Sequence, residues 1–265
     1  MPASPSRKPS TEAPRRSLAW PVAIVVLTVL GFVVAFLPAS LTQRFLPPDV
    51  QAGDASGTIW HGSFARISAR GHDFGAVEWR LHPLSLLGGK LGATVRWVKQ
   101  DFVLDAEVEV ASNAVAARQV HGAGSLESLA DLGFTHGWSG AGKVDINSFA
   151  LKDKKITAAS GTVSMSGLKS AQFESADLGG FEMSFPDDAL QPDGTATAQV
   201  RDTGGPLQLQ GTVSLAPAQG IATFTGAIKE RGDLPASLRQ QLVNLIQMRG
   251  RDPQGRIPLD IEFSL

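Results

Sequence analysis

The chain has 265 residues, a formal net charge of −1 at pH 7, 43% hydrophobic residues and no cysteine. This length and apolar content suffice for one large domain or two modest ones, and they exclude a wholly disordered chain. The lack of cysteine excludes disulfides, thiolate metal ligands and cysteine nucleophiles. Of the 24 basic and 25 acidic residues, four and one fall in residues 1–20, so the rest of the chain is mildly acidic and lacks the basic surface of a nucleic-acid-binding protein.

The first 37 residues divide into a polar tail and an apolar stretch. Residues 1–19 are rich in proline, serine, threonine and basic side chains, a composition that predicts a disordered tail. The stretch from Trp20 to Leu37 carries no charge. As a helix it would reach about 27 Å, close to the ~30 Å hydrocarbon core of a bilayer. We therefore predict a single transmembrane helix over residues 20–37.

Four residues mark the ends of this predicted membrane anchor. Trp20 suits the membrane interface, Pro21 falls in the first helical turn, Leu37 is the last apolar residue and Pro38 stops the helix. The basic tail predicts a cytoplasmic N-terminus and a periplasmic remainder, at the bacterial inner membrane. The alternative is a cleaved signal peptide, which a long basic region and a poor cleavage site after Leu37-Pro38-Ala39 disfavour.

Beyond a short amphipathic turn over residues 39–48, apolar residues recur at every second position, which is the pattern of strands with one buried face. The alternation is clearest over residues 77–82, 102–110, 143–147, 207–215 and 257–265. Such strands form antiparallel sheets packed on one side. We predict a mainly β protein in which residues 38–265 form a curved antiparallel β-sheet domain of eight to twelve strands, with a candidate seam near residues 133–142.

Few helices are expected in this domain. Residues 82–87 predict a single turn stopped by Gly88-Gly89, and residues 125–132 a short helix with Ser125 as its N-cap. The clearest helix runs from Pro235 to Met248 and carries an apolar stripe. That stripe consists of Leu238, Leu242, Leu245 and Ile246.

The stretch from Gly57 to Gly62 begins the strand-rich part of the chain and predicts a first β-hairpin. Ile59 and Trp60 stand between the two glycines, and Thr58 and His61 flank them. A tryptophan offers a large surface for burial. We expect the Trp60 indole to anchor the sheet core, so that Trp60→Ala would be a core lesion costing about 3–5 kcal/mol.

No constellation for catalysis, cofactor binding or metal binding stands out. The five histidines lack recognised ligand spacing, and no G-x-S-x-G motif supports a hydrolase built on His72-Asp73 or His136. The glycine-rich segments 88–90 and 122–124 complete no phosphate-binding fingerprint. Paired acids, namely Asp187-Asp188 and Glu107 with Glu109, read as a turn and a polar strand face. We predict a protein that is not an enzyme, with no cofactor and no metal.

Three patterns in this order resemble the type II secretion system protein N family. Gly57-Thr58-Ile59-Trp60-His61-Gly62 is similar to the family's G-T-x-W-x-G motif. It is followed by residues 75–83, which include Trp79 and Pro83, and by the Leu86-Leu87 turn. The third pattern is the helix around residues 238–242 with the segment 252–256 that leads into the last strand.

The resemblance implies an accessory, non-catalytic inner-membrane subunit of the machinery that exports folded proteins across the outer membrane. Its expected partners are other secretion subunits, namely the inner-membrane platform and, as a second candidate, the secretin. The alternative is a lipid-binding or lipid-transport protein, because proteins of the AsmA and TamB type share an N-terminal span, a long periplasmic sheet and glycine-tryptophan motifs. An unfilled apolar trough would favour that alternative.

Overall fold

The computed structural model describes residues 36–132, 137–173, 175–232 and 234–264. The chain divides into two compact units, Met1–Leu37 and Pro38–Leu265. The predicted tail and nearly all of the predicted transmembrane helix, including Trp20 and Pro21, lie outside the described residues, so both stay predictions. Within the described ranges, the helices are all too short or too polar to cross a bilayer.

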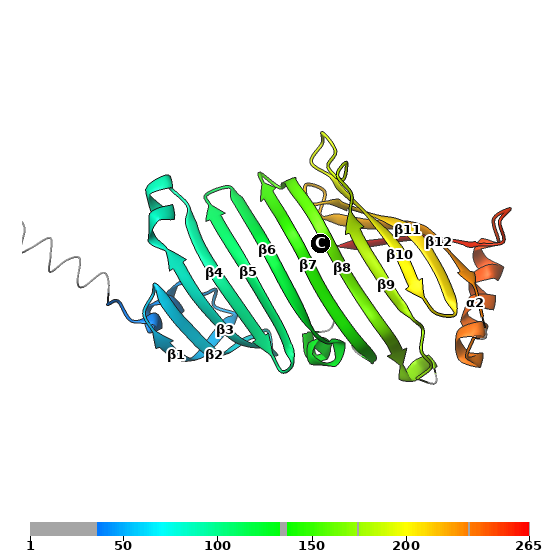
Figure 1. Ribbon diagram of the computed structural model, residues 1–265, viewed down its shortest axis with the longest axis horizontal. Coiled ribbons are helices and arrows are strands. Elements are labelled where there is room, and N and C mark those ends of the chain that lie inside the picture. The colour runs from blue at the N-terminus through cyan, green and yellow to red at the C-terminus, as the bar shows by residue number, and fades with distance from the viewer. Residues whose placement is uncertain (1–35, 133–136, 174, 233, 265) are drawn as a thin grey trace, which may run out of the picture. The chain divides into compact units, whose positions relative to one another are not determined.

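The described residues of the second unit form one antiparallel sheet of thirteen strands, whose order in the sheet is their order in the chain (Figure 1). The antiparallel class is confirmed, whereas the predicted count of eight to twelve strands was too low. The strands are β1 (Val50–Gly57), β2 (His61–Ala69), β3 (His72–His82), β4 (Leu91–Lys99), β5 (Phe102–Ala111), β6 (Ala114–Ser125), β7 (Trp138–Lys152), β8 (Lys155–Ser170), β9 (Gly180–Phe185), β10 (Ala196–Gly204), β11 (Leu207–Ala216), β12 (Ile221–Glu230) and β13 (Ile257–Ser264). β6 and β7, which flank the candidate seam, pair in one ladder that reaches Ser125 and Ala141.

The described helices lie in the connections between strands, except η1, which precedes β1. The predicted turn after His82 and the predicted helix after Ser125 are both present as 3₁₀ helices, and the predicted C-terminal helix is an α-helix. Leu238 and Leu242 of that helix are buried, as its apolar stripe predicts. The helices are η1 (Ala39–Phe45), η2 (Pro83–Gly88), η3 (Leu126–Leu132), η4 (Ala171–Phe173) and α2 (Ala236–Arg249).

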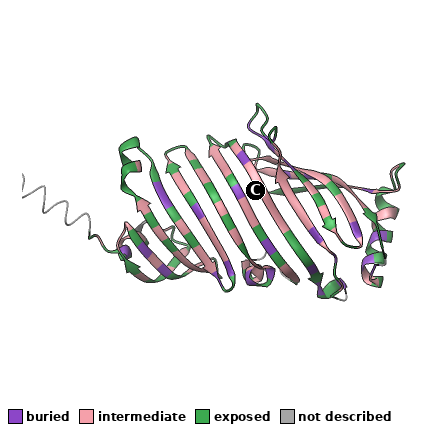
Figure 2. Ribbon diagram, in the orientation of Figure 1, coloured by how far each residue is buried: buried purple, intermediate pink, exposed green. Residues whose placement is uncertain are grey.

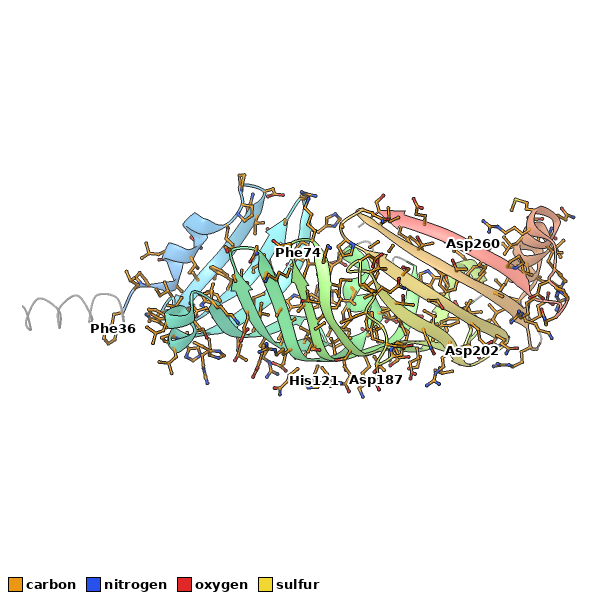
Figure 3. All side chains as sticks on the ribbon, turned by 90° about the horizontal axis from the view of Figure 1, so that it is seen from above. Phe36, Phe74, His121, Asp187, Asp202 and Asp260 are labelled. Atoms are coloured by element: carbon orange, nitrogen blue, oxygen red, sulfur yellow. The ribbon has the colours of Figure 1, made fainter. Side chains whose placement is uncertain are left out.

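The sheet is bent into a trough, and His121 lies on its outer side (Figure 3). Side chains alternate between the two faces of a strand, so the neighbours of His121 in sequence and their cross-strand partners line the inner face. Along that inner face Val144 pairs with Val163, Val163 with Met183 and Met183 with Val200. The concave face is therefore apolar and the convex face is polar.

The described core is densest where helices cover the concave face. The largest buried cluster joins Leu126 of η3 and Phe173 of η4 to Leu238 and Leu242 of α2, and Ile257 of β13 is fully buried within it. Elsewhere the strand residues are mostly half-buried (Figure 2). This follows from a single-layer sheet, in which most apolar side chains are covered only by their neighbours on the same face.

The segment from Gly57 to Gly62 forms the turn between β1 and β2, so the predicted first hairpin is confirmed. Its anchoring indole is Trp79 of β3. The Trp79 Nε1–H donates to the carbonyl oxygen of Ile59 at 2.9 Å, and the Trp79 ring lies 4.8 Å from the ring of the buried Phe64. Trp60 itself is half-buried. The expectation that Trp60 anchors the core is wrong, because Trp60 lies in the turn and not at an inward-facing strand position.

Gly62 is the residue that lets the Trp79 ring close over this turn. A Cβ atom at position 62 would lie 2.7 Å from Cζ2 of Trp79, 2.7 Å from the oxygen of Thr58 and 2.9 Å from the oxygen of Ser56. Two of these three neighbours are backbone atoms, which cannot move without shifting the hairpin. Gly62 and Trp79, which are distant in the sequence, thus pack directly against each other in the fold.

We expect Gly62→Ala to lower the free energy of unfolding by about 1–3 kcal/mol, the usual cost of overpacking. The matched control is Gly88→Ala, because a Cβ atom at position 88 meets nothing within 4 Å. Urea unfolding followed by tryptophan fluorescence would measure both variants. Equal stability of the two would contradict the close packing of Trp79 on Gly62.

Candidate functional site

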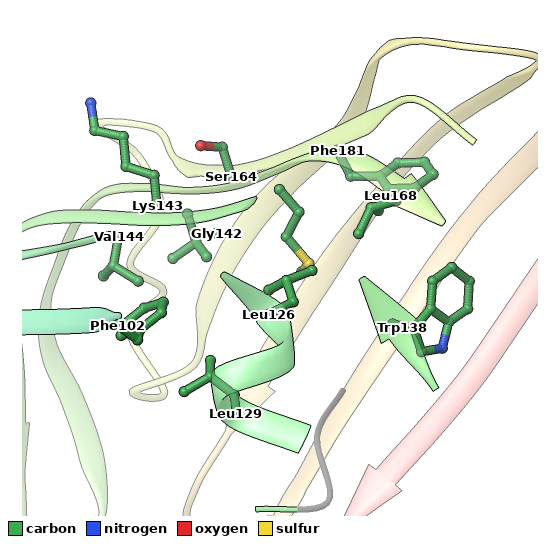
Figure 4. A pocket seen from close by; sticks show the side chains of 12 residues that line it. Phe102, Leu126, Leu129, Trp138, Gly142, Lys143, Val144, Ser164, Leu168 and Phe181 are labelled. Atoms are coloured by element: carbon green, nitrogen blue, oxygen red, sulfur yellow. The ribbon is translucent and has the colours of Figure 1, made fainter. Parts of the chain in front are cut away.

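The described residues enclose an apolar pocket of about 420 Å³ on the concave face. It lies between η3 and strands β5, β7, β8 and β9 (Figure 4). Carbon atoms make up nearly all of its wall. The side chains that shape it include Phe102, Leu126, Trp138, Val144, Met165 and Phe181.

Strand register places these side chains together. Gly142 pairs with Met165, and Met165 pairs with Phe181 on the next strand, so residues distant in sequence form one wall. Lys143 and Ser164 alternate with them, and their side chains point away from the pocket (Figure 4). A Cβ atom at Gly142 would lie 3.0 Å from Cδ2 of Leu126, so the glycine allows η3 to approach the sheet.

One end of η3 is held to the sheet by the Asp101 carboxylate. The hydroxyl of Ser125 donates to Asp101 Oδ1 at 2.8 Å, its backbone N–H donates to Oδ2 at 3.2 Å, and the hydroxyl of the buried Ser128 also donates to Oδ1. The Ser128 hydrogen bond, followed by that of Ser125, lowers the pKa of Asp101 from its ordinary value. Ser125, expected as an N-cap, thus binds the side chain of Asp101 in the turn between β4 and β5.

The other end of η3 is held by Lys99, which is 4% exposed. Its Nζ donates to Asp131 Oδ2 at 2.9 Å and to the carbonyl oxygen of Asp73. The hydrogen bond and the charge of Lys99 lower the pKa of Asp131. The His72 ring also contacts the carbonyl oxygen of Asp131. These contacts fix η3 as one wall of the pocket.

It was not predicted from the sequence that Asp101 and Lys99 hold the two ends of η3, although the position of Lys99 indicated a buried lysine. Lys99 falls at an inward position of β4, in phase with Ala93, Val95 and Trp97. A buried lysine at an apolar position needs a charged or hydrogen-bonding partner. No pattern in the sequence identified Asp131 as that partner, because the two residues are brought together only by the fold.

The described residues offer little for catalysis or metal binding. Within the described ranges there is no group of three or more histidine, aspartate or glutamate side chains that could hold a metal ion. His136 lies outside the described residues. Asp187 and Asp188 are exposed in a turn, and Glu109 pairs with Arg118 at 3.2 Å on the polar face. The apolar pocket among the described residues can bind an apolar group.

The predicted motif residues gather away from the pocket. Gly57, Thr58, Ile59, Trp60 and Gly62 lie at one end of β1 and β2. Trp79 closes over them, and Pro83 begins η2. Pro38, where the sheet unit begins, forms a β-bridge with Thr58 at this same end.

The two edges of the sheet differ. The edge formed by β1 is partly covered, since Pro38 bridges to Thr58 and the Gln43 amide donates to the carbonyl oxygen of Ala52 at 3.0 Å. At the other edge, β13 pairs with β12, and the described chain places no strand on its outer side. Ile261 and Phe263 of β13 are exposed.

The described residues thus form an open antiparallel sheet whose strands follow one another in chain order and whose concave face is apolar. Comparisons with known proteins identify the family of this chain. A model of the family "Type II secretion system (T2SS), protein N" matches residues 48–260. The match spans most of the chain, and the chain belongs to this family.

Two curated relatives, both named type II secretion system protein N, match over a shorter region. The protein of Aeromonas hydrophila is 38% identical over 68 residues, and that of Vibrio cholerae serotype O1 is 36% identical over 67 residues. Each match covers 24% of this chain and 27% of the relative. The match thus spans about a quarter of each relative's length. No solved structure matches the chain.

Acid should loosen the η3 attachment, because a carboxylate whose folded pKa is lowered stabilises the fold above its unfolded pKa of about 3.9 and loses this effect as pH falls through the folded pKa. We expect the melting temperature to fall as pH is lowered below about 5, through Asp101 and Asp131. Asp101→Asn should lower the melting temperature at pH 7 and flatten its pH dependence. Asp187→Asn, in an exposed turn, is the control and should keep the wild-type profile.

Proposed function

We propose that this protein is an accessory subunit of the type II secretion machinery, anchored in the inner membrane by residues 20–37. Its sheet then lies in the periplasm and docks other secretion subunits without catalysing a reaction. The observation that carries this proposal is the family match over residues 48–260. The names of the two relatives, which identify them as components of this secretion system, support it.

The outer edge of β13 is the docking surface that the geometry favours. An unpaired strand edge can accept a strand from a partner. The exposed apolar residues Ile261 and Phe263 alternate with the exposed acids Asp260 and Glu262. A partner strand that alternates apolar with basic residues would match both faces.

The partners that fit this proposal are subunits of the inner-membrane platform, with the outer-membrane secretin as a second candidate. The predicted anchor would place the sheet beside the platform. The apolar character of the described pocket supports a role in binding and not in chemistry, because general acid–base or nucleophilic catalysis requires converging polar groups.

A lipid-binding role is the second candidate, and the apolar pocket is the observation that favours it. A pocket of about 420 Å³ with an apolar wall suits an aliphatic chain and offers almost nothing to a polar ligand. Its place on the concave face of an open sheet resembles the trough expected of the AsmA and TamB type. In this case the ligand would lie along η3 against Met165 and Val144.

Deleting the gene should abolish or strongly reduce the export of folded proteins, measured as their enzymatic activity in the culture medium. Complementation with the double variant Ile261→Lys/Phe263→Lys should restore export about fivefold less well than the wild type, the effect of losing about 1 kcal/mol at an interface. Met248→Lys, at an exposed apolar residue of α2, is the control. Unchanged export in the deletion strain would contradict the secretion role.

For the second candidate, the protein extracted from membranes should carry lipid that survives purification and is detected by native mass spectrometry. Val144→Lys/Val163→Lys would place two charges in the pocket and should remove most of this lipid. Val115→Lys, at an exposed residue of β6 outside the pocket, should leave the lipid in place. Lipid-free wild-type protein would rule the candidate out.

A further inference from the structure

The turn η2 presents aliphatic side chains to solvent. Leu84 and Leu87 are 80% and 87% exposed, and Leu86 is also exposed. The turn is ordered by hydrogen bonds, because the Gly89 N–H donates to the oxygen of Leu86 at 3.0 Å and the Lys90 N–H donates to the oxygen of Ser85 at 3.2 Å. A fixed turn that exposes several leucines together is characteristic of a surface that contacts another apolar phase.

The strand register locates η2 at the end of the sheet where the sheet unit begins. Gly57 pairs with Gly62 and Gly62 with Trp79, and β3 ends three residues later at His82, where η2 starts. Pro38 bridges to Thr58 at this end. In Figure 1, η2 extends beyond the strand ends next to β4. Hence Pro38, the Thr58–Trp60 turn and η2 all lie at the same end of β1, β2 and β3.

We propose that η2 inserts Leu84 and Leu87 into the periplasmic leaflet of the inner membrane, as a second membrane contact of the sheet domain. The inference rests on the proposed membrane anchor. With the membrane span proposed at residues 20–37, the chain would leave the bilayer at Leu37, one residue before Pro38. The apolar phase nearest to this end of the sheet is therefore lipid, which is why lipid is the occupant proposed.

The residues around η2 have the chemistry of a membrane interface. Trp60 lies half-buried in the neighbouring turn, and tryptophan is enriched where a protein meets the headgroup region. Arg80 and Lys90, on either side of η2, are exposed and basic, and Lys90 also pairs with Glu109 at 3.7 Å; exposed basic groups suit anionic lipid headgroups. Aliphatic residues that reach into the acyl chains with basic residues behind them are typical of interfacial anchoring.

The absence of cysteine allows a direct test, because a single introduced cysteine carries the only label. The full chain is reconstituted in liposomes that contain anionic lipid, with a nitroxide label at Leu84→Cys, Leu87→Cys, Met248→Cys or Val29→Cys. Collision with oxygen, which concentrates in lipid, is compared with collision with a water-soluble nickel complex. Met248 is the matched control, since it is 76% exposed and lies on α2 near the opposite edge of the sheet.

The expected result is that oxygen collisions dominate at positions 84 and 87, as they should at position 29 within the predicted span, whereas nickel collisions dominate at position 248. Nickel-dominated collisions at positions 84 and 87, together with oxygen-dominated collisions at position 29, would overturn the η2 inference and leave the anchor standing. Nickel-dominated collisions at position 29 would overturn the anchor itself. Oxygen-dominated collisions at 248 as well would show nonspecific adsorption and would also overturn the inference.

Discussion

The structure depends on a single constraint, namely that one apolar face of a one-layer sheet must be kept from water. A second sheet or a full layer of helices would normally cover such a face. Here the described chain supplies only short helices, and α2, η3 and η4 cover part of it. The sheet also bends. Bending brings the side chains on the concave face closer to one another and so reduces the apolar surface that the helices leave exposed to water. The apolar pocket lies where this partial cover ends.

Hydrogen bonds of polar side chains fix the position of η3, one of the helices that cover the concave face. Lys99 and Asp101 stand at the two sides of the β4–β5 turn, and each binds one end of η3 through Asp131 or through Ser125 and Ser128. A buried lysine is costly unless it is paired, so the pairing with Asp131 selects one position for η3. The shape of the pocket thus depends on hydrogen bonds made outside it. The same logic applies to the Gly57–Gly62 turn, which Trp79 fixes through one N–H and one ring contact.

Local patterns allowed the strands and the C-terminal helix to be predicted, because alternation and the 3.6-residue period are written in consecutive residues. The role of Trp60 was misassigned because Gly62 and Trp79 meet only through the register of β2 with β3. The strand count was too low because β1 and the inward positions of β10 carry mostly glycine and alanine, and because β9 is only six residues long. The pocket could not be foreseen, since its walls come from β5, β7, β8, β9 and η3. Family membership was recoverable from the motif, even though the motif lies apart from the pocket.

The strict agreement between strand order and chain order has a consequence for how this protein can change and assemble. Each strand pairs only with the strands next to it in sequence, so nearly all pairing is local and loop closure costs little entropy. A hairpin can be added or removed without rewiring any other connection, as in a repeat array. The length of the sheet is therefore an adjustable quantity. Such a sheet could be lengthened or shortened at its β13 edge while the hairpin of β1 and β2 stays the same.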